Sequence, residues 1–383
     1  MKKVVSSERL PIKLWLDDLD DDALEQAKNL ANLPFAYKWI AIMPDSHVGY
    51  GMPIGGVMAT KNVIVPNAVG VDIGCGMVAT KTNLTEISTP QLDEWRKLVL
   101  GYIPVGFNHQ KADIHWAGFN DAPDLPVINR ELSSARRQLG TLGGGNHFIE
   151  LQKDQDGFVW LMIHSGSRNF GLKTAKEYHD KAKALCQKWL SDIPTLDLAF
   201  LPMGEKLGDE YLAAMNFALA FAQENRAVMM DWAKIALTEV VGGGVDYNEY
   251  ANIHHNFAAM EHHYGSNVLV HRKGATKATN DTIGIIPGSM GSSSYIVQGL
   301  GNPESFESCS HGAGRTLGRG QAKRELNLEE EQAKMAGIVS GLTSVDNLDE
   351  APGSYKDISQ VMANQSDLVE ILVELRPLAN VKG

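Results

Sequence analysis

The spacing of apolar residues along the chain predicts three long helical segments. Apolar side chains recur every three or four positions over residues 17–33, 173–189 and 209–241, which is the period of a helix with one buried face. The first segment begins with acidic residues, which suit the positive end of a helix dipole. In the third, the apolar stripe consists of Leu212, Met215, Leu219, Ala222 and Met229. We interpret this stripe as core packing rather than as a cofactor site.

Other parts of the chain have the pattern of strands. Residues 40–82 alternate glycine-rich turns with runs of Val, Ile and Ala, and the strand pattern returns over residues 268–297. By contrast, residues 253–263 are predicted to form a helix that carries His254 and His255. Neighbouring helical residues point about 100° apart, so we do not expect these two histidines to bind one ion together.

Loops and element order complete the prediction of the fold class. The glycine run 242–244 is expected to be a plain loop between helices, and residues 121–126 and 346–352 are expected to be surface loops. Strands and helices do not alternate as they do in a parallel α/β sheet, so the pattern predicts an α+β fold of mixed, packed β-sheets surrounded by helices. Because we find no convincing linker, we expect a single catalytic domain over residues 1–383.

The composition of the chain indicates the cellular compartment in which we expect the protein. The 383 residues are 44% hydrophobic, which is enough to build a large core. The three cysteines, Cys75, Cys186 and Cys309, are widely spaced and odd in number, which argues against a disulfide framework and for a reducing compartment. No apolar run reaches the length of a membrane span, and the start of the chain lacks a signal-like apolar stretch. We therefore expect a cytoplasmic protein with no membrane partner.

The segment Ser310-His311-Gly312-Ala313-Gly314-Arg315 is the most informative motif. Its glycines allow the backbone to approach a ligand closely, and Arg315 offers a planar fork to an anion. A neutral imidazole is a competent nucleophile near pH 7, so His311 is the candidate to attack phosphorus. Standing alone, the motif also fits a tight turn with a hydrogen-bonded histidine.

Four other segments contain residues that bind metals. Asp72 and Cys75 are three residues apart, His147 follows a glycine-rich loop, His164 ends an apolar run, and His255 lies farther along the chain. This mixed set of sulfur, nitrogen and oxygen ligands could hold one or two ions and suits Zn, Mn, Fe or Co rather than Mg or Ca. Ligand chemistry alone favours zinc. Each segment separately also fits a structural role, such as a buried thiol beside a turn-capping aspartate.

In this order, the motifs resemble those of the RtcB RNA ligases, close to end to end. The matching segments are residues 43–47, 71–76, 145–148, 164–168, 255–256, 287–291, 310–315 and 381–383. The resemblance implies an RtcB-like fold with a central metal and GTP cleft. It also implies a GTP- and Mn²⁺-dependent enzyme that joins RNA ends carrying a 3′-phosphate or 2′,3′-cyclic phosphate to 5′-hydroxyl ends.

The resemblance also assigns residues to roles. His311 matches the nucleophile that carries GMP, and Asp72, Cys75, His147, His164 and His255 match the metal ligands, with Cys75 bridging two ions; Zn²⁺ or Co²⁺ are other possible occupants. Asn146 and Asn256 match residues near the nucleotide phosphates. The guanosine pocket is matched by Glu150, Ser289, Ser294, Tyr355 and Lys382, with Tyr355 stacking on the base. The remaining nucleotide-binding positions are Pro287, Gly288, Met290, Gly312, Ala313 and Gly314.

Net charge and a few departures from the family bear on RNA binding. The net charge is −11, so an RNA groove on this protein must be locally positive. The candidates for it are Arg136, Arg137, Arg168, Arg315 and Arg319, although Arg136 and Arg137 also fit a solvated helix face. Leu317-Gly318-Arg319 stands where family members often have Met-Ser-Arg, and Ser46 replaces a frequent valine. These changes bear on RNA preference rather than on the chemistry.

Two other functions remain open at this stage. A metal-dependent phosphodiesterase or cyclic-phosphate hydrolase acting on RNA ends would need the metal ligands but not His311, Glu150 or Lys382. A catalytically silent RNA binder would have lost at least one ligand, and none is missing.

Among common nucleotide motifs, residues 49–55 miss the dinucleotide-binding spacing by one residue. For partners we expect RNA ends of the stated chemistry and an activating protein, and for the oligomeric state a monomer.

Overall fold

A computed structural model describes residues 1–383, and its elements give an α+β fold as predicted. The helices are α1 Asp21–Ala31, α2 Pro66–Val69, α3 Thr89–Tyr102, α4 Pro126–Gln138, α5 Arg168–Trp189, α6 Lys206–Val241, α7 Arg319–Glu325, α8 Leu328–Lys334 and α9 Ile358–Ala363. The first strands are β1 Lys3–Val5, β2 Ile12–Leu14, β3 Ala36–Tyr50, β4 Met52–Thr60, β5 Val63–Ile64, β6 Gly76–Thr82, β7 Phe148–Asp154, β8 Val159–Ser165 and β9 Leu201–Pro202. The later strands are β10 Tyr247–His254, β11 Asn256–His263, β12 Ser266–Lys273, β13 Ala275–Lys277, β14 Ile283–Ile286, β15 Ser294–Gly299, β16 Ser308–Ser310 and β17 Val369–Lys382.

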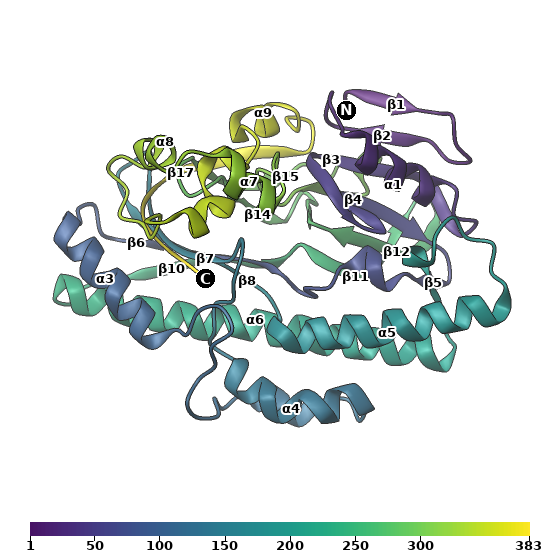
Figure 1. The fold of residues 1–383 in the computed structure, drawn as a ribbon, viewed down its shortest axis with the longest axis horizontal. Coiled ribbons are helices and arrows are strands. Elements are labelled where there is room, and N and C mark those ends of the chain that lie inside the picture. Colours follow the sequence, from purple (N-terminus) through teal and green to yellow (C-terminus); the bar gives the residue numbers. More distant parts are fainter.

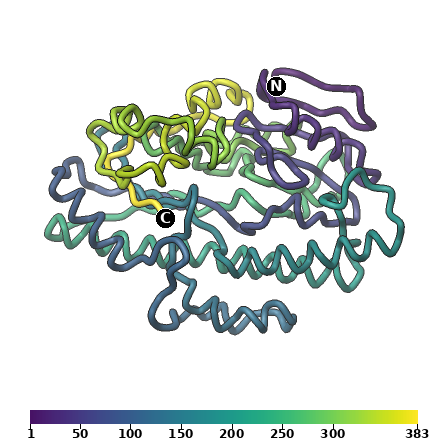
Figure 2. Tube along the Cα trace, viewed as in Figure 1, coloured from purple at the N-terminus to yellow at the C-terminus, as the bar shows by residue number.

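Two large sheets make up the body of the molecule: a six-stranded sheet that is mixed, because β2 and β3 are parallel, and a seven-stranded sheet that is antiparallel throughout. One has the order β1-β2-β3-β4-β12-β11, and the other has the order β10-β6-β8-β7-β17-β15-β14. The long helices α5 and α6 run along one side of the sheets, and α4 lies farther out on the same side (Figures 1 and 2). Their apolar faces bury the largest hydrophobic cluster, while α3 and α6 cover the seven-stranded sheet. No helix is both long and apolar enough to cross a membrane.

The predicted helix over residues 253–263 is wrong, because this segment forms β10 and β11. β10 pairs antiparallel with the distant strand β6, and β11 forms an antiparallel hairpin with the next strand, β12, so strand pairing overrides the predicted helical pattern. Consecutive residues of extended backbone point to opposite sides, which directs His255 and His254 to different neighbours. The expected separation of the two histidines therefore holds for a different reason.

Two loop predictions also need correction. The glycine run 242–244 joins α6 to β10 rather than two helices, and all three glycines have positive φ. Residues 346–352 do not form an exposed loop, because Val345–Glu350 is a 3-10 helix and Leu348 and Glu350 are buried. The three long predicted helices are confirmed as α1, α5 and α6, with shifted ends.

Asn225 on α6 connects the helical layer to the loops that precede β7 and follow β8. This fully buried side chain accepts hydrogen bonds from the backbone N–H groups of Gly140 and Thr141 at 2.7 and 3.1 Å. Its amide nitrogen donates to the carbonyl oxygens of Thr141 and Gly166, each at 3.1 Å. One side chain thus fixes the loops on either side of the β7–β8 pair.

We predict that Asn225→Ala lowers the free energy of unfolding by about 3 kcal/mol, because it leaves buried backbone groups without partners. The matched control is Asn216→Ala, since Asn216 is an exposed residue on the same helix. Denaturant unfolding of both variants measures the difference. Equal stability of the two variants would contradict this role for Asn225.

Candidate active site

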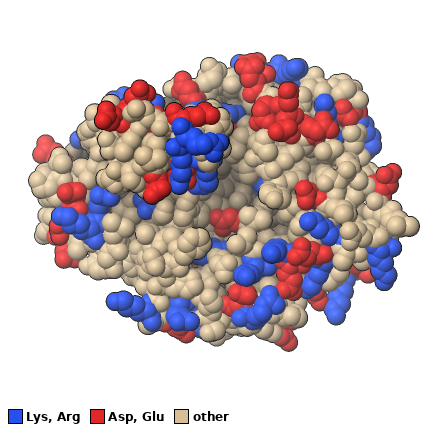
Figure 3. Space-filling model, in the orientation of Figure 1, with Lys and Arg blue, Asp and Glu red and all other residues tan.

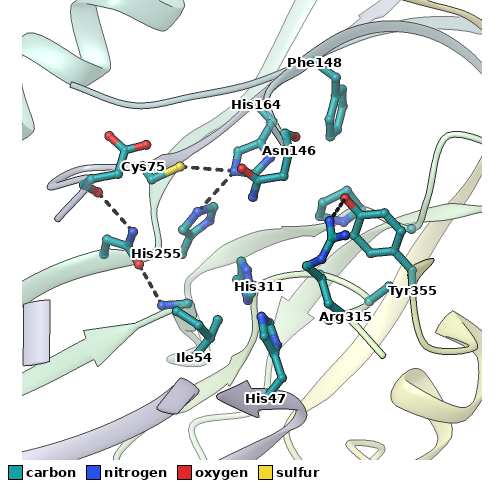
Figure 4. A pocket seen from close by; sticks show the side chains of 18 of the residues that line it. His47, Ile54, Cys75, Asn146, Phe148, His164, His255, His311, Arg315 and Tyr355 are labelled. Atoms are coloured by element: carbon teal, nitrogen blue, oxygen red, sulfur yellow. Dashed lines mark hydrogen bonds between the residues drawn. The ribbon is translucent and has the colours of Figure 1, made fainter. Parts of the chain in front are cut away.

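A cavity of about 220 Å³ opens where the strand ends and loops of both sheets meet (Figure 4). The sequence-predicted residues that line it are Asp72, Cys75, Asn146, His164, His255, Asn256, Pro287, Gly288, His311, Gly312, Ala313, Gly314, Arg315, Arg319, Tyr355 and Lys382. His47, Ile54, Phe148 and Gly274 also line it. Segments that are far apart in the sequence therefore contribute to one site.

The five predicted metal ligands converge on one side of this cavity. The Sγ atom of Cys75 lies 3.4 Å from Nε2 of His147 and 3.2 Å from Nε2 of His164. The Nε2 atoms of His164 and His255 are 3.3 Å apart, and Oδ2 of Asp72 lies 3.0 Å from Nε2 of His147. Cys75, His147 and His164 have ligand atoms close enough together to hold one ion.

In His147 and His164, a hydrogen bond from Nδ1 to the backbone decides that Nε2 faces the other predicted metal ligands. Nδ1 of His147 lies 3.0 Å from the carbonyl oxygen of Leu142, and Nδ1 of His164 lies 3.1 Å from that of Asn146. A carbonyl oxygen can only accept, so each Nδ1 carries the proton and each Nε2 presents a lone pair. The Nε2 lone pairs thus face the Cys75 thiol, the Asp72 carboxylate and one another. A bound cation would stabilise such a group of electron-pair donors.

Burial shapes the protonation of this group. Burial, together with the nearby histidines, holds the pKa values of His164 and His255 well below the usual range, so both rings are neutral. Burial would raise the pKa of Asp72, but its polar and charged neighbours, His147 and Arg168 among them, outweigh burial and lower it, so the carboxyl is ionised. Burial and then the Asp72 charge raise the pKa of the Cys75 thiol. This mixed set of donors fits a transition-metal ion, which would stabilise the thiolate.

Arg226 on α6 lies behind the ligands and is completely buried. Its Nη1 donates to the carbonyl oxygens of Gly74 and Ser165 at 2.8 and 3.0 Å, next to Cys75 and His164. Its Nη2 lies 3.1 Å from Nδ1 of His254, the residue that precedes His255. Burial lowers the pKa of Arg226 to about 10, so the guanidinium is charged at neutral pH. It joins the three ligand-bearing segments.

His311 lies on the other side of His255, with 4.7 Å between the ring centroids. Its Nδ1 lies 2.6 Å from Oδ2 of Asp45, and the same oxygen accepts from the backbone N–H groups of His311 and Gly312. Burial would raise the pKa of Asp45, but the contact with His311 and the nearby Lys356 charge outweigh burial and keep the carboxylate ionised. The ionised carboxylate accepts the Nδ1 proton, so the lone pair of a neutral His311 ring lies on Nε2.

Two glycines permit close backbone approaches in the site. Gly314 has φ +76°, and a Cβ atom there would lie 2.0 Å from the carbonyl oxygen of Asp45. Gly143 has φ +95°, and a Cβ atom there would lie 2.1 Å from the Arg168 guanidinium and 2.5 Å from Nδ1 of His147. Any side chain at Gly314 would displace Asp45, which contacts the candidate nucleophile, and any side chain at Gly143 would displace Arg168 or the predicted ligand His147.

The predicted nucleotide-binding residues fall into two groups. Asn146, Asn256, Pro287, Gly288, Tyr355 and Lys382 line the cavity together with residues 312–314. Glu150 and Ser294 lie behind it, joined by Gln152, whose amide donates to Glu150 at 2.7 Å and to Ser294 at 3.0 Å. Ser289 and Met290 also lie outside the lining set, with the Ser289 hydroxyl 2.9 Å from that of Ser292.

The predicted arginines are dispersed. Arg319 and Arg315 line the cavity, but Arg315 donates to the carbonyl oxygens of Leu317 and Asp349 and is held within the protein. Arg168 donates to Thr141 and Gly106 and lines a second cavity of about 460 Å³ that shares Asp72. Arg136 and Arg137 end α4 and line neither cavity; Arg136 lies over the Phe119 ring. Figure 3 shows Lys and Arg side chains gathered over α7, on the rim of the hollow.

Sequence reasoning missed three residues with evident roles here. Asp45 belongs to a matched motif, but no spacing ties it to His311, which is 266 residues away. Arg226 sits within a helix whose pattern indicates only packing, and Glu350 falls in a segment predicted to be a surface loop. A charged residue within an apolar helix pattern is the signal that could have drawn attention to Arg226, whereas the loop-like pattern around Glu350 offers no such signal.

Comparisons with known proteins place the chain in one family. The family described as tRNA-splicing ligase RtcB matches residues 26–123 and 114–383. RNA-splicing ligase RtcB of Escherichia coli K12 is 40% identical over 406 residues, covering 100% of this chain and 99% of its own length. A tRNA-splicing ligase RtcB of Pyrobaculum aerophilum is 32% identical, covering 98% of this chain and 95% of its own length.

We predict that Cys75→Ala lowers the amount of transition metal bound per chain, because it removes the only sulfur ligand from the centre. The matched control is Cys186→Ala, which removes a thiol buried among helices away from the cavity. Metal analysis of both proteins after dialysis against Mn²⁺ or Zn²⁺ gives the comparison. Equal metal content in the two variants would leave Cys75 as a structural thiol only.

Proposed function

Since the chain belongs to the RtcB family and is an RNA ligase, we propose that it seals RNA through a GTP- and Mn²⁺-dependent route in which His311 carries GMP. The RNA ends would be a 3′-phosphate or 2′,3′-cyclic phosphate on one strand and a 5′-hydroxyl on the other. The observation that carries the proposal is the position of His311, held by Asp45 within reach of the predicted metal ligands.

The first step is attack by Nε2 of His311 on the α-phosphorus of GTP. The P–N bond forms as the bond to the pyrophosphate leaving group breaks, and the Nδ1–H bond to Asp45 stabilises the positive charge on the ring. Bound Mn²⁺ ions, held by Asp72, Cys75, His147, His164 and His255, would neutralise phosphate charge and polarise the reacting phosphorus.

The second and third steps transfer GMP to RNA and join the ends. An oxygen of the RNA 3′-phosphate attacks the phosphoramidate, which frees His311 and leaves GMP on the RNA end. Attack by the 5′-hydroxyl then forms the phosphodiester and releases GMP. A cyclic phosphate would first be hydrolysed to the 3′-phosphate.

The proposed contacts of the RNA backbone are Arg168 and Arg319, which line the two cavities that share Asp72. The other candidates are less well placed, because Arg136 and Arg137 line neither cavity and Arg315 is held within the protein.

Selection of guanine is proposed to rest on Glu150. A carboxylate can accept from the N1–H and exocyclic amine of guanine, whereas adenine presents an acceptor at the corresponding position. Lys382 lies on β17, which pairs with β7 and so places this lysine beside Phe148 and near Glu150. Tyr355 and Phe148 supply aromatic rings to the same cavity. Ser289, Met290 and Ser294 would complete the guanosine pocket from behind.

Other features of the proposal concern the setting. We propose action on tRNA halves or on broken RNA in the cytoplasm, by a monomer that an activating protein assists. A metal-dependent phosphodiesterase acting on RNA ends is the alternative function, because the metal ligands alone suffice for hydrolysis. The His311–Asp45 pair favours the ligase, since a hydrolase has no need of an oriented nucleophilic histidine.

We predict that His311→Ala abolishes covalent GMP transfer to the protein and RNA joining, while metal content is retained. The assay supplies labelled GTP, Mn²⁺, a 2′,3′-cyclic phosphate RNA and a 5′-hydroxyl RNA, and omits each in turn. His262→Ala is the control, because His262 is an exposed residue of β11. Joining without GTP, or cleavage without any joining, would support the phosphodiesterase instead.

We predict that GTP binding weakens as the pH falls below about 7. Burial raises the pKa of Glu150 to about 7, with partial opposition from the Lys382 charge and the Gln152 hydrogen bond. The carboxylate that accepts from guanine is present above this pKa and is protonated below it, so the half-saturating GTP concentration rises by up to about tenfold per pH unit.

The control for this pH dependence is Glu150→Gln, whose side chain does not titrate. Its half-saturating GTP concentration should be higher at pH 8 and should lack the added rise below pH 7. Metal content measured at each pH separates loss of nucleotide from loss of ions. The same pH dependence in both proteins would remove Glu150 as its source.

A further inference from the structure

A buried carboxylate outside the predicted site, Glu350, lies behind the cationic wall of the cavity. It is 6% exposed and ends the 3-10 helix Val345–Glu350. Its oxygens accept from Arg315 Nη1 at 3.2 Å, Arg319 Nη1 at 2.7 Å, Lys382 Nζ at 3.2 Å and the Tyr355 hydroxyl. All four donor residues line the cavity, whereas Glu350 does not. In Figure 4, Arg315 and Tyr355 lie side by side on the opposite side of His311 from Cys75.

The cationic partners of Glu350 differ in what else holds them. Arg315 also donates to the carbonyl oxygens of Leu317 and Asp349, so its position has other supports. Arg319 is bound through Nη1 alone, to Asp349 and Glu350, and Lys382 makes its hydrogen bond to Glu350 only. Arg319 and Lys382 therefore face the cavity with donors to spare. Lys382 depends on Glu350 for its hydrogen bond, and Arg319 is held by Glu350 together with Asp349.

Charge gives a second reason why the cluster needs this carboxylate. Three cationic side chains share one buried anion, so removing the anion would leave like charges close together in a poorly hydrated place. Burial would raise the pKa of Glu350, but the charges of Lys382 and Arg319 outweigh it and keep the carboxylate ionised. The cluster retains excess positive charge toward the cavity, as an anionic ligand requires.

We propose that Glu350 is a positioning residue that holds Arg319 and Lys382 in the orientation that binds the nucleoside triphosphate. This inference rests on the proposed function, because it assumes that GTP enters this cavity. Glu350 touches neither the reacting atoms nor the predicted metal ligands. Its effect should therefore fall on nucleotide binding rather than on the chemistry of His311.

The test compares Glu350→Gln with the wild-type protein in the guanylylation reaction with Mn²⁺. Gln keeps the size of the side chain and removes its charge. We expect the half-saturating GTP concentration to rise by about tenfold or more, from loss of charge-assisted hydrogen bonds. The rate at saturating GTP and the metal content should change little. Glu350→Asp keeps the charge on a shorter stem and should recover part of the loss.

Glu331→Gln is the matched control for damage to the local structure. Glu331 is a buried carboxylate of α8 that accepts from the backbone N–H of Gly353 at 2.8 Å and from Lys334 at 2.6 Å, and it contacts no cavity residue named above. Equal increases in half-saturating GTP for both Gln variants would overturn the inference and assign Glu350 a structural role. An unchanged Glu350→Gln protein would also overturn it.

Two further results complete the test. If thermal unfolding shows that Glu350→Gln does not fold, Glu350→Asp is measured in its place. A half-saturating GTP concentration in Glu350→Asp equal to that of the wild-type protein would then contradict the inference. Failure of the wild-type protein to form a GMP adduct would instead refute the proposed function. The two failures are therefore distinguishable.

Discussion

The arrangement of the predicted metal ligands depends on one buried guanidinium. Arg226 bonds to backbone oxygens beside Cys75 and His164 and contacts the residue before His255, so a single side chain of α6 fixes three separate segments. Isolated buried charges are costly, but this one has several partners and the acidic Asp72 nearby, which offsets the cost of burial. Asn225, the preceding residue, secures the loops that lead to His147 and follow His164. Helix α6 thus fixes the positions of the segments that carry the predicted metal ligands.

Hydrogen bonds give different chemistry to the histidines of this site. His164 donates from Nδ1 to a backbone oxygen and presents Nε2 to the predicted metal, whereas His311 donates from Nδ1 to a carboxylate. The carboxylate stabilises a cationic ring, which a nucleophile becomes after attack, while the neutral carbonyl suits a ring that stays neutral. His254 contacts Arg226 and remains structural. Ring environment, rather than residue type, separates these roles.

Sequence patterns predicted the helices with long apolar stripes and the residues that carry distinctive chemistry. Cys75, His147 and His164 stand beside glycines or at the end of an apolar run, and the structure places their ligand atoms close together, while their role as metal ligands stays a prediction. The strands at residues 247–263 were missed because strand pairing decides their structure: β10 pairs with β6, which lies far away in the sequence, and β11 forms a hairpin with β12. Asp45 and Glu350 were missed for the same reason, since each acts through partners that only the folded chain supplies.

The pairing of Asp45 with His311 across 266 residues has a consequence for synthesis of the protein. A growing chain that has emerged only as far as β12 already contains Asp45 and the five predicted metal ligands, but it lacks the nucleophile. In such a partial chain the Asp45 carboxylate has no imidazole ring to orient. Because contacts of such large sequence separation form late and slowly, we expect the Asp45–His311 pair to form after the segments that carry the predicted metal ligands have been made. The candidate nucleophile is then oriented only when the native topology is complete.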